Sequence, residues 1–330
     1  DEPLIAKDKR RRMKKFLVLI LLTLFSATGC VMINLPRQEP LAEKAIEGSG
    51  ADKVLIIDIE GVITAQEARG SMLSRAEATI TARVKEELLL AAKDEHIKAI
   101  VLRINSPGGS VTTCDIISHE LKAFKKKKNI PVVAELMDVA ASGGYYLAVT
   151  ADKIIAHPTT VTGSIGVIAY SVNAAGLMEK IGIANQTVKT GAMKDIGSPL
   201  KTMTDDERRV IKSVIDGMYE RFLEVILDGR KSLKRDELER LADGRVFSAK
   251  QALDSKLIDS IGYMEDAIDS AKQLAGIKEA TVITYSQPRA YKNNIYSALQ
   301  EGPAQVNLLN IDAGLFTERL GMSFMYVWMP

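Results

Sequence analysis

The sequence has 330 residues, 46% of them hydrophobic and 26% charged, a balance typical of a globular protein with a core, which excludes wholesale disorder. The formal net charge is +2, but residues 1–15 carry seven basic and three acidic side chains, so residues 16–330 sum to −2. A body without excess positive charge argues against general nucleic-acid binding. The two cysteines cannot form a disulfide framework, no Cys/His cluster has zinc spacing, and we see no coenzyme-binding signature, so neither a metal nor a cofactor is expected.

The N-terminus carries a candidate membrane anchor. The basic residues 1–15 lead into residues 16–35, an uncharged stretch of 20 residues that is long enough to span a bilayer as one helix. Alternatively, the apolar run that ends at Cys30 resembles a bacterial lipoprotein signal, with cleavage before Cys30 and acylation of its thiol. We favour the retained helix, because Ala27 stands where this signal usually has leucine. The preceding basic residues orient the chain, so either anchor predicts that the remainder lies on the extracytoplasmic side of a bacterial cytoplasmic membrane.

Beyond the anchor, a linker is expected to precede one α/β domain. Residues 36–52 are polar and contain two prolines and two glycines, which is typical of a linker. From there on, short β-branched runs alternate with helical patterns. The expected strands are residues 54–59, 97–104, 132–136, 153–156, 186–189 and 280–285. The expected helices are residues 76–92, 111–127, one from Ser142, 174–181, a long one from Asp205 that opens with a capping box of Thr204 and Glu207, 235–241, 249–253 and 264–274. This alternation predicts an α/β fold with a largely parallel sheet over residues 53–290, followed by a C-terminal extension, 291–330.

Three glycine-rich segments each follow an expected strand, where α/β folds form their sites. The first, Ser106–Ser110, joins a sharp turn to the unpaired N–H groups of a helix start, and is either an oxyanion hole or only a tight turn. In the second, Asp138–Tyr146, Ser142 opens a helix among small residues, and is either a nucleophile or a helix cap. The third, Thr162–Val167, either lines a cleft or is a plain loop.

A serine nucleophile needs a base, and the chain has only three histidines. Of these, only His157 is near the glycine-rich segments in sequence. A lysine serves instead where burial lowers its pKa from about 10.4 toward neutrality. Lys189 and Lys194 are the candidates, in the segment 189–197. Composition and spacing do not choose between the two lysines.

Five segments of the chain carry a family resemblance. They are NSPGGS at 105–110, AASGGYYLA at 140–148, TGSIGV at 162–167, KTGAMKDIGSP at 189–199 and GRVFSAKQALDSKLIDSIG at 244–262. In this order, and spanning about residues 50–285, they resemble the signal peptide peptidase A family of bacterial membrane-bound serine peptidases, in its short, single-copy form. The resemblance implies a ClpP/crotonase-like fold, a β-α superhelix that assembles into rings, and peptide hydrolysis by a serine–lysine dyad.

The resemblance also implies roles for individual residues. Ser142 matches the nucleophile and Lys194 the general base, which chooses Lys194 among the candidate bases. Ser164 matches a serine that hydrogen-bonds the lysine amine. Gly109 matches a backbone donor to the oxyanion, and Gly143 is a second candidate donor. A ring allows neighbouring subunits to supply the two members of the dyad, but we expect both within one subunit, with the lysine amine in a dry pocket.

The substrates implied by the resemblance are cleaved signal peptides, which are apolar and extended. An extended peptide is expected to add a strand beside Gly109–Val111. The residues expected to contact it are Gly108, Ser110, Val111, Gly163 and Ile165. The expected partners are therefore apolar peptides, the membrane and further copies of the chain in a ring.

The C-terminal residues 322–330 are strongly apolar. We expect them to dock on a neighbouring subunit, rather than to be disordered or to contact the membrane. Two other functions stay open. One is a catalytically silent scaffold that keeps the fold to organise membrane partners, against which the intact Ser142, Lys194, Ser164 and Gly109 argue. The other is an acyl-CoA-processing enzyme of the crotonase type, which explains neither the anchor nor the serine–lysine pair.

Overall fold

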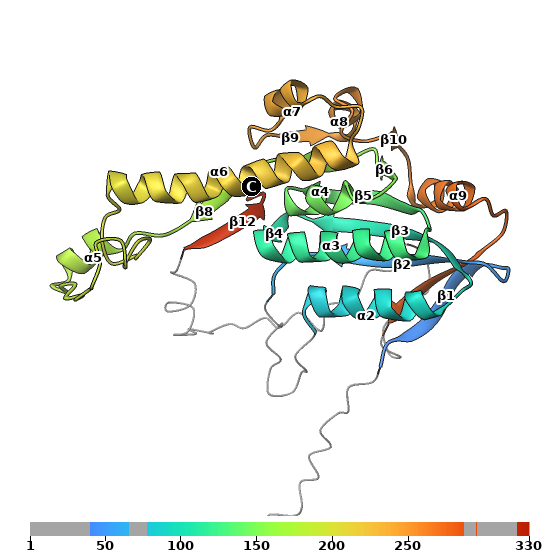
Figure 1. The fold of residues 1–330 in the computed structure, drawn as a ribbon, viewed down its shortest axis with the longest axis horizontal. Helices are drawn as coiled ribbons and strands as arrows, with labels where there is room; N and C mark the ends of the chain where they lie inside the picture. Colours follow the sequence, from blue (N-terminus) through green and yellow to red (C-terminus); the bar gives the residue numbers. More distant parts are fainter. Residues whose placement is uncertain (1–39, 66–77, 287–294, 296–321, 330) are drawn as a thin grey trace, which may run out of the picture. The chain divides into compact units, whose positions relative to one another are not determined.

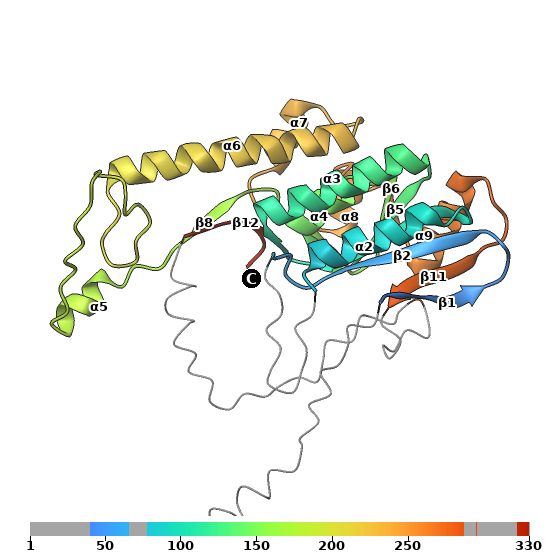
Figure 2. The ribbon, with the colours of Figure 1, turned by 60° about the horizontal axis from the view of Figure 1, so that its bottom comes forward.

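The computed structural model describes residues 40–65, 78–286, 295 and 322–329, in which helices cover a mixed β-sheet (Figures 1 and 2). The strands are β1 (Ala42–Gly48), β2 (Lys53–Glu60), β3 (Ile97–Ser106), β4 (Gly108–Ser110), β5 (Val132–Ala141), β6 (Lys153–Ala156), β7 (Val161–Gly163), β8 (Ile168–Tyr170), β9 (Val246–Ser248), β10 (Ser260–Ile261), β11 (Thr281–Ser286) and β12 (Ser323–Val327). The helices are α2 (Ile80–Lys93), α3 (Val111–Lys128), α4 (Gly143–Ala148), α5 (Ala175–Lys180), α6 (Asp205–Gly229), α7 (Arg235–Leu241), α8 (Ala249–Asp254) and α9 (Met264–Ala275).

The larger sheet is mainly parallel. Its main path runs β1-β11-β2-β3-β5-β6-β10, and only the β1–β11 pair on that path is antiparallel. A branch adds β7 parallel to β5, and β9 pairs antiparallel with β7. The central strands β2 and β3 are buried along almost their whole length, as expected for parallel strands covered on both faces. The expected α/β fold with a largely parallel sheet is thereby confirmed.

Two apolar clusters pack on opposite faces of this sheet. On one face, α2, α3 and α4 cover a cluster that includes Leu102 and Leu136. On the other face, α9 covers a cluster that includes Val101 and Val133. Each such side chain contributes roughly 1.5–3 kcal/mol when it is fully buried, so the sheet is a firm support for the loops that follow its strands.

The carboxyl ends of β3 and β5 lie side by side, since the two strands are parallel neighbours with Ser106 paired to Ala140. After β3 the chain turns through β4 into α3, and after β5 it turns at Ser142 into α4. Two of the glycine-rich segments are therefore delivered to one edge of the sheet, where α/β proteins place their sites.

Residues 171–214, here called the arm, extend away from the sheet in both views (Figures 1 and 2). The arm holds α5, the connection 181–204 and the first part of α6. The expected capping box opens α6: the Thr204 hydroxyl accepts from the Glu207 N–H at 3.2 Å, and the Glu207 carboxylate accepts from the Thr204 N–H at 3.0 Å. These two bonds end the connection and start the helix at a defined residue.

The apolar side chains of α6 are buried over only part of the length of the helix. Phe222 and Ile226 are 0% exposed against the body of the protein. Val210 and Val214, which lie toward the start of the helix, are 44% and 41% exposed. Ile211 in the same half is only 8% exposed, so the described residues leave uncovered the side of the first half that bears Val210 and Val214.

Three segments differ from the sequence expectation. Residues 42–48, inside the expected linker 36–52, form β1, because pairing with β11 uses backbone hydrogen bonds and needs no apolar pattern. Residues 186–189 form no strand, since they lie in the arm, where Val188 is 97% exposed and no strand is beside them to pair with. Residues 323–327 form β12, which pairs with β4 and β8 of the same chain rather than with a neighbouring subunit.

No helix within residues 40–65, 78–286 and 322–329 has the length and apolar character needed to cross a membrane. The candidate anchor at residues 16–35, its Cys30 and the basic residues 1–15 lie outside the described residues. Most of the C-terminal extension, residues 296–321, lies outside them as well.

Candidate active site

The three glycine-rich segments of the sequence meet at the carboxyl edge of the sheet. The Ser142 N–H donates to the Gly163 carbonyl oxygen at 2.7 Å, where β5 and β7 run side by side. Gly143 lies directly against the first segment, because a Cβ added to Gly143 would stand 3.0 Å from the Gly108 Cα. Gly108–Ser110, Ser142–Gly143 and Gly163–Ile165 therefore lie together at this edge.

Ser142 is held in a strained backbone conformation, with φ 52° and ψ −112°, between the end of β5 and the first residue of α4. A positive φ at a residue other than glycine costs about 1–3 kcal/mol and tends to occur at functional sites. A serine on a sharp strand-to-helix turn is the geometry of a nucleophile elbow. The sequence did not reveal this geometry, since Ala140 stands where the elbow motif has glycine.

The Ser142 side chain is buried and has no partner. The residue is 1% exposed, and its Oγ forms no hydrogen bond with any described residue. A buried hydroxyl left without a partner costs roughly 1–3 kcal/mol, and such groups are rare in proteins outside sites that use them. The oxygen is thus not engaged by any group among the described residues, and none of them stands in position to take its proton.

The backbone around the two candidate oxyanion donors is tightly packed. The Ile63 N–H donates to the Gly108 carbonyl at 2.9 Å, and the Ile63 carbonyl accepts from the Ser110 N–H at 2.8 Å. A Cβ on Gly109 would stand 2.0 Å from that same Ile63 carbonyl oxygen, so only glycine fits. Backbone donors fixed in this way, at Gly109 and at Gly143 across from it, suit the stabilisation of a developing negative charge.

The strand position expected for a bound peptide is taken by the chain's own C-terminus. In β12, Tyr326 pairs antiparallel with Gly109, and the Trp328 N–H donates to the Pro107 carbonyl at 2.8 Å. This is the edge, along residues 109–111, where the sequence analysis expects an extended peptide to add. The edge is therefore suited to an antiparallel strand, and in this structure the strand is β12.

Tyr326 anchors β12 in an aromatic cluster behind the site. Its ring lies 5.2 Å from the ring of Tyr146 on α4 and 4.6 Å from that of Phe222 on α6. Its hydroxyl donates to the Met218 carbonyl oxygen at 2.7 Å, and the residue is 0% exposed. The C-terminal strand is thus held by a buried side chain as well as by its backbone.

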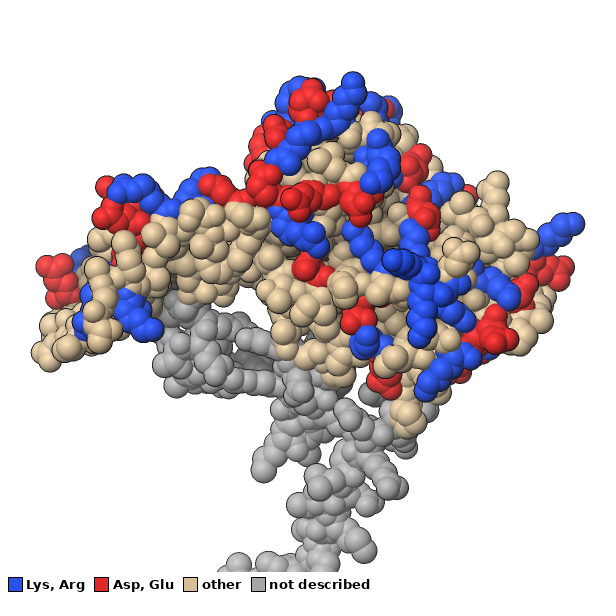
Figure 3. Space-filling view, in the orientation of Figure 1, with Lys and Arg blue, Asp and Glu red and all other residues tan. Residues whose placement is uncertain are grey.

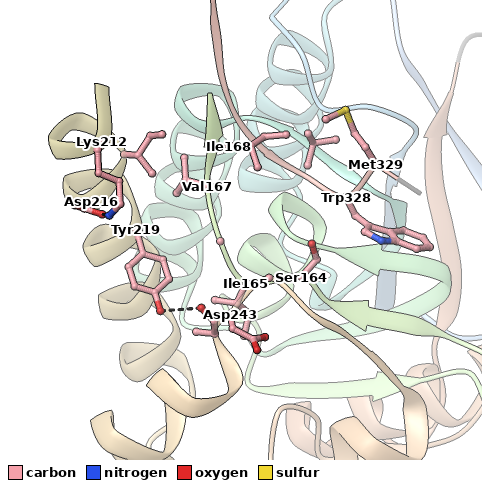
Figure 4. A pocket seen from close by; sticks show the side chains of 15 residues that line it. Ser164, Ile165, Val167, Ile168, Lys212, Asp216, Tyr219, Asp243, Trp328 and Met329 are labelled. Atoms are coloured by element: carbon pink, nitrogen blue, oxygen red, sulfur yellow. Dashed lines mark hydrogen bonds and ion pairs between the residues drawn. The ribbon is translucent and has the colours of Figure 1, made fainter. Parts of the chain in front are cut away.

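A cavity of about 520 Å³ opens beside Ser164. Figure 4 shows Ser164 and Ile165 on one side of it, Tyr219 of α6 across from them, and Trp328 at the end of the C-terminal strand. Ser164 has φ 49°, and its N–H donates to the Arg245 carbonyl at 2.8 Å. Because Ser164 follows the Gly163 that accepts from the Ser142 N–H, the cavity lies next to the strained turn at Ser142.

The structure does not bring Lys194 to Ser142 within one chain. Lys194 is exposed and lies in the connection 181–204, between α5 and the start of α6, and both lie away from α4 in Figures 1 and 2. The expectation of a dyad inside one subunit, with its amine in a dry pocket, is therefore not met here, because no helix or strand of the described residues carries the connection back over α4. The Lys194 amine has no hydrogen bond or ion pair within the described residues, whereas Lys189 pairs with Asp195 at 2.7 Å.

His157, the other candidate base, is also engaged elsewhere. Its Nδ1 lies 2.9 Å from the Thr159 hydroxyl, and its ring packs edge-on against Tyr263 at 4.9 Å between centroids. Since the Ser142 Oγ has no hydrogen-bond partner among the described residues, His157 is not its base in this arrangement.

Comparison with known proteins agrees with the site. The model of peptidase family S49 matches residues 124–278, and that of Clp protease matches residues 65–162. A protein of Enterococcus faecium named "Putative signal peptide peptidase SppA" is 36% identical over 258 residues, which cover 78% of this chain and 74% of that protein. Serine protease SPPA of Arabidopsis thaliana chloroplasts is 33% identical over 254 residues, 76% of this chain and 37% of that protein. Protease 4 of Salmonella typhi is 32% identical over 229 residues, 67% of this chain and 36% of that protein.

The first of these relatives is matched along most of both chains, and the family match spans α4 with the strained Ser142. The parallel sheet, the glycine-rich edge and the Clp protease match agree on a ClpP-like fold. The chain therefore belongs to peptidase family S49, the family of signal peptide peptidase A, and is a serine peptidase.

Proposed function

We propose that this serine peptidase is a membrane-anchored endopeptidase that degrades cleaved signal peptides and other apolar peptides, with Ser142 as nucleophile and Lys194 as general base. The observation that carries the proposal is that the two proposed catalytic groups lie apart in one chain and each lacks a partner among the described residues. Among the described residues, the buried Ser142 Oγ has no hydrogen-bond partner, and the Lys194 amine on the arm has none either. In a ring of identical copies, the arm of one copy completes the site of the next.

The surface of the arm supports this assembly. Its exposed apolar side chains, from 39% to 97% exposed, are Val172, Leu177, Ile181, Ile183, Val188, Met193, Leu200, Val210 and Val214. Figure 3 shows a largely uncharged surface below the charged upper edge of α6. Concentrated exposure of this kind is uncommon in a monomer and typical of an interface. A second copy packed on the arm would also remove water from Lys194.

The surroundings of the two lysines favour Lys194 as the base. Lys189 donates to the Asp195 carboxylate at 2.7 Å and to the Ala192 carbonyl at 2.9 Å. Lys189, with Lys201, holds the pKa of Asp195 down at about 2, so this carboxylate stays charged and keeps both lysines in ion pairs. A general base must be free to accept a proton, and Lys194 has no carboxylate partner among the described residues.

The proposed reaction follows from this geometry. Neutral Lys194 accepts the proton of the Ser142 hydroxyl, and the oxygen attacks the carbonyl carbon of a peptide bond. The oxyanion that forms is stabilised by the N–H groups of Gly109 and Gly143. The lysine ammonium then gives its proton to the leaving amine, and water hydrolyses the acyl-enzyme by the same steps. Ser164, on the cavity, donates or accepts a hydrogen bond that orients the lysine amine.

The substrate proposal rests on the edge of β4, where β12 now pairs, and on the predicted anchor. An extended peptide that displaces β12 would pair along Gly108–Val111, with Gly163 and Ile165 on its other side. Such a site binds a peptide mainly through hydrogen bonds to the peptide backbone, which suits apolar peptides of varied sequence. Residues 16–35 would hold the catalytic domain at the extracytoplasmic face of a bacterial cytoplasmic membrane, beside the cleaved signal peptides that remain there.

Mixing two inactive variants tests the proposal. Ser142→Ala and Lys194→Ala are each expected to lose hydrolysis of an apolar fluorogenic peptide. When the two proteins are unfolded together and refolded in equal amounts, activity should return to about one quarter of the wild-type value, because each site in a head-to-tail ring draws its residues from two copies. Lys189→Ala serves as the matched control and should retain activity.

Each other result has a clear meaning. Full activity in Ser142→Ala contradicts the peptidase site itself. Inactive single variants whose mixture stays inactive, although the mass of the assembly is unchanged, contradict the shared dyad. If Lys189→Ala loses activity and Lys194→Ala retains it, the general base is Lys189 and the assignment of Lys194 is wrong.

A further inference from the structure

We propose that Asp115 is a positioning residue: its carboxylate holds Tyr146, and through Tyr146 the first turn of α4, where Ser142 faces the β4 strand. This inference rests on the proposed role of Ser142 as nucleophile. Asp115 is not placed to touch a substrate. It acts through the tyrosine that follows the nucleophile by one helical turn.

The contacts form a short chain between the two halves of the catalytic edge. The Tyr146 hydroxyl donates to the Asp115 Oδ1 at 2.5 Å. At its other end, the Tyr146 backbone N–H donates to the Ser142 carbonyl oxygen at 2.8 Å. Asp115 lies in the first turns of α3, which begins at the residue after β4. The hydrogen bond of Tyr146 thus connects the turn at Ser142 to α3, the helix that directly follows β4 and its candidate oxyanion donor Gly109.

The tyrosine is a stiff connection, because its ring has no room to move. Tyr146 is 0% exposed, and its ring packs against Phe222 at 5.1 Å between centroids. Burial, together with the hydrogen bond to Asp115, raises the pKa of Tyr146 above its ordinary value, so its hydroxyl stays protonated and remains a donor. Without an acceptor in Asp115, a buried hydroxyl would have to move toward another partner or stay unpaired, and either change disturbs α4.

The same carboxylate oxygen also contacts α6. Arg221 donates to Asp115 Oδ1 from Nη2 at 3.1 Å and from Nε at 3.2 Å. Because Arg221 is about half exposed, this ion pair alone contributes little. Its position is informative, since α6 is the helix whose other end carries the arm and Lys194. Asp115 is therefore the one carboxylate in the described residues that bonds to both α4 and α6 beside the nucleophile.

A double-mutant cycle on the full chain tests this role. Asp115→Ala and Tyr146→Phe are each expected to lower kcat for an apolar fluorogenic peptide roughly 10- to 100-fold, as for other displacements of a reacting group by a fraction of an ångström. KM should change much less. If Asp115 acts through Tyr146, the double variant loses no more than the worse single variant. Asp115→Asn keeps an acceptor for the tyrosine and should recover most of kcat.

The matched control is Asp228→Asn. It removes a second ion pair between α3 and α6, Lys122–Asp228 at 3.0 Å, at a site away from Tyr146. It should leave kcat unchanged. The melting temperature of every variant is measured, and kcat is expressed per folded enzyme. The rate at which a fluorophosphonate labels Ser142 measures the reactivity of the nucleophile separately from the later steps of turnover. Mass spectrometry identifies the labelled residue.

The outcomes separate this inference from the proposed function. Losses that multiply in the double variant, or a wild-type kcat and labelling rate in Asp115→Ala, overturn the positioning role. A fall in melting temperature without a fall in kcat per folded enzyme also overturns it, because Asp115 would then be structural only. Hydrolysis that persists in Ser142→Ala overturns the proposed function instead.

Discussion

Glu135 is buried in the middle of β5 without a partner. It is 0% exposed, and neither carboxylate oxygen has a hydrogen-bond partner among the described residues. The neighbouring Arg103 on β3 donates to Asp58 instead, at 2.7 Å. Burial, followed by the charges of Asp266 and Glu265 at the start of α9, raises the pKa of Glu135 from 4.5 to about 9. The carboxyl group therefore keeps its proton in the folded state at neutral pH.

This burial predicts a stability that depends on pH. Between pH 4.5 and 9 the unfolded Glu135 is ionised while the folded one is protonated, so the free energy of unfolding falls as pH rises, by on the order of 1 kcal/mol per pH unit. Glu135→Gln should remove this slope and be more stable than wild type at pH 8, with little difference at pH 5. Urea unfolding at both values measures it. The exposed Glu86→Gln is the control, and equal slopes in wild type and Glu135→Gln would refute the assignment.

At the scale of elements, α6 joins the body of the protein to the arm. Its second half packs through Phe222, whereas its first half buries Ile211 and begins at the capping box. Lys201 bonds to both Asp195 at 2.9 Å and Glu207, so the cap also fixes the connection that carries the proposed base. A substitution at the start of α6 is thus expected to alter the position of the proposed base without changing the packing of the core.

We expect Thr204→Ala to loosen this start selectively. Loss of the capping box costs about 1 kcal/mol, which should appear as faster hydrogen exchange in the first turns of α6 and as a moderate fall in peptidase rate. Exchange around Phe222 should stay as in wild type. The neighbouring Thr202→Ala, which removes an exposed threonine outside the cap, is the matched control. Equal exchange in both variants would show that the cap does not hold the helix start.

At the scale of the whole molecule, the C-terminal strand β12 affects both the stability of the fold and the access of a peptide to the edge of β4. Removal of residues 322–330 takes away the Tyr326 ring, and loss of a buried aromatic side chain costs about 3 kcal/mol or more. The melting temperature should therefore fall. The rate of hydrolysis of short apolar peptides, per folded enzyme, should rise, because the edge beside Gly109 is then free. Both quantities and the mass of the assembly are measured on the full chain and the shortened one.

Tyr326→Phe separates the two effects of this removal. It keeps the ring between Tyr146 and Phe222 and loses only the hydroxyl that bonds to Met218. It should melt near the wild-type temperature and keep the wild-type rate. If the shortened chain shows no change in melting temperature, rate or mass, β12 does not dock on the edge in solution.

The sequence by itself determined the class of fold, and it predicted the residues of the candidate active site. Strands and helices with strong periodicity lie close to where the pattern predicts them, because a buried parallel strand or an amphipathic helix is decided by its own side chains. The glycine-rich segments around Gly109, Ser142 and Ser164 converge as expected, since parallel strands deliver their following loops to one edge.

Only the tertiary structure decided which distant segments meet. The pairing of β1 with β11 and of β12 with β4 depends on backbone edges, which leave no pattern in the side chains. The separation of Lys194 from Ser142 depends on the direction in which α6 carries the arm, and the burial of Glu135 depends on the α9 that covers it. These features depend on packing between elements that are far apart in the chain. They therefore cannot be predicted from the residue pattern of any single segment.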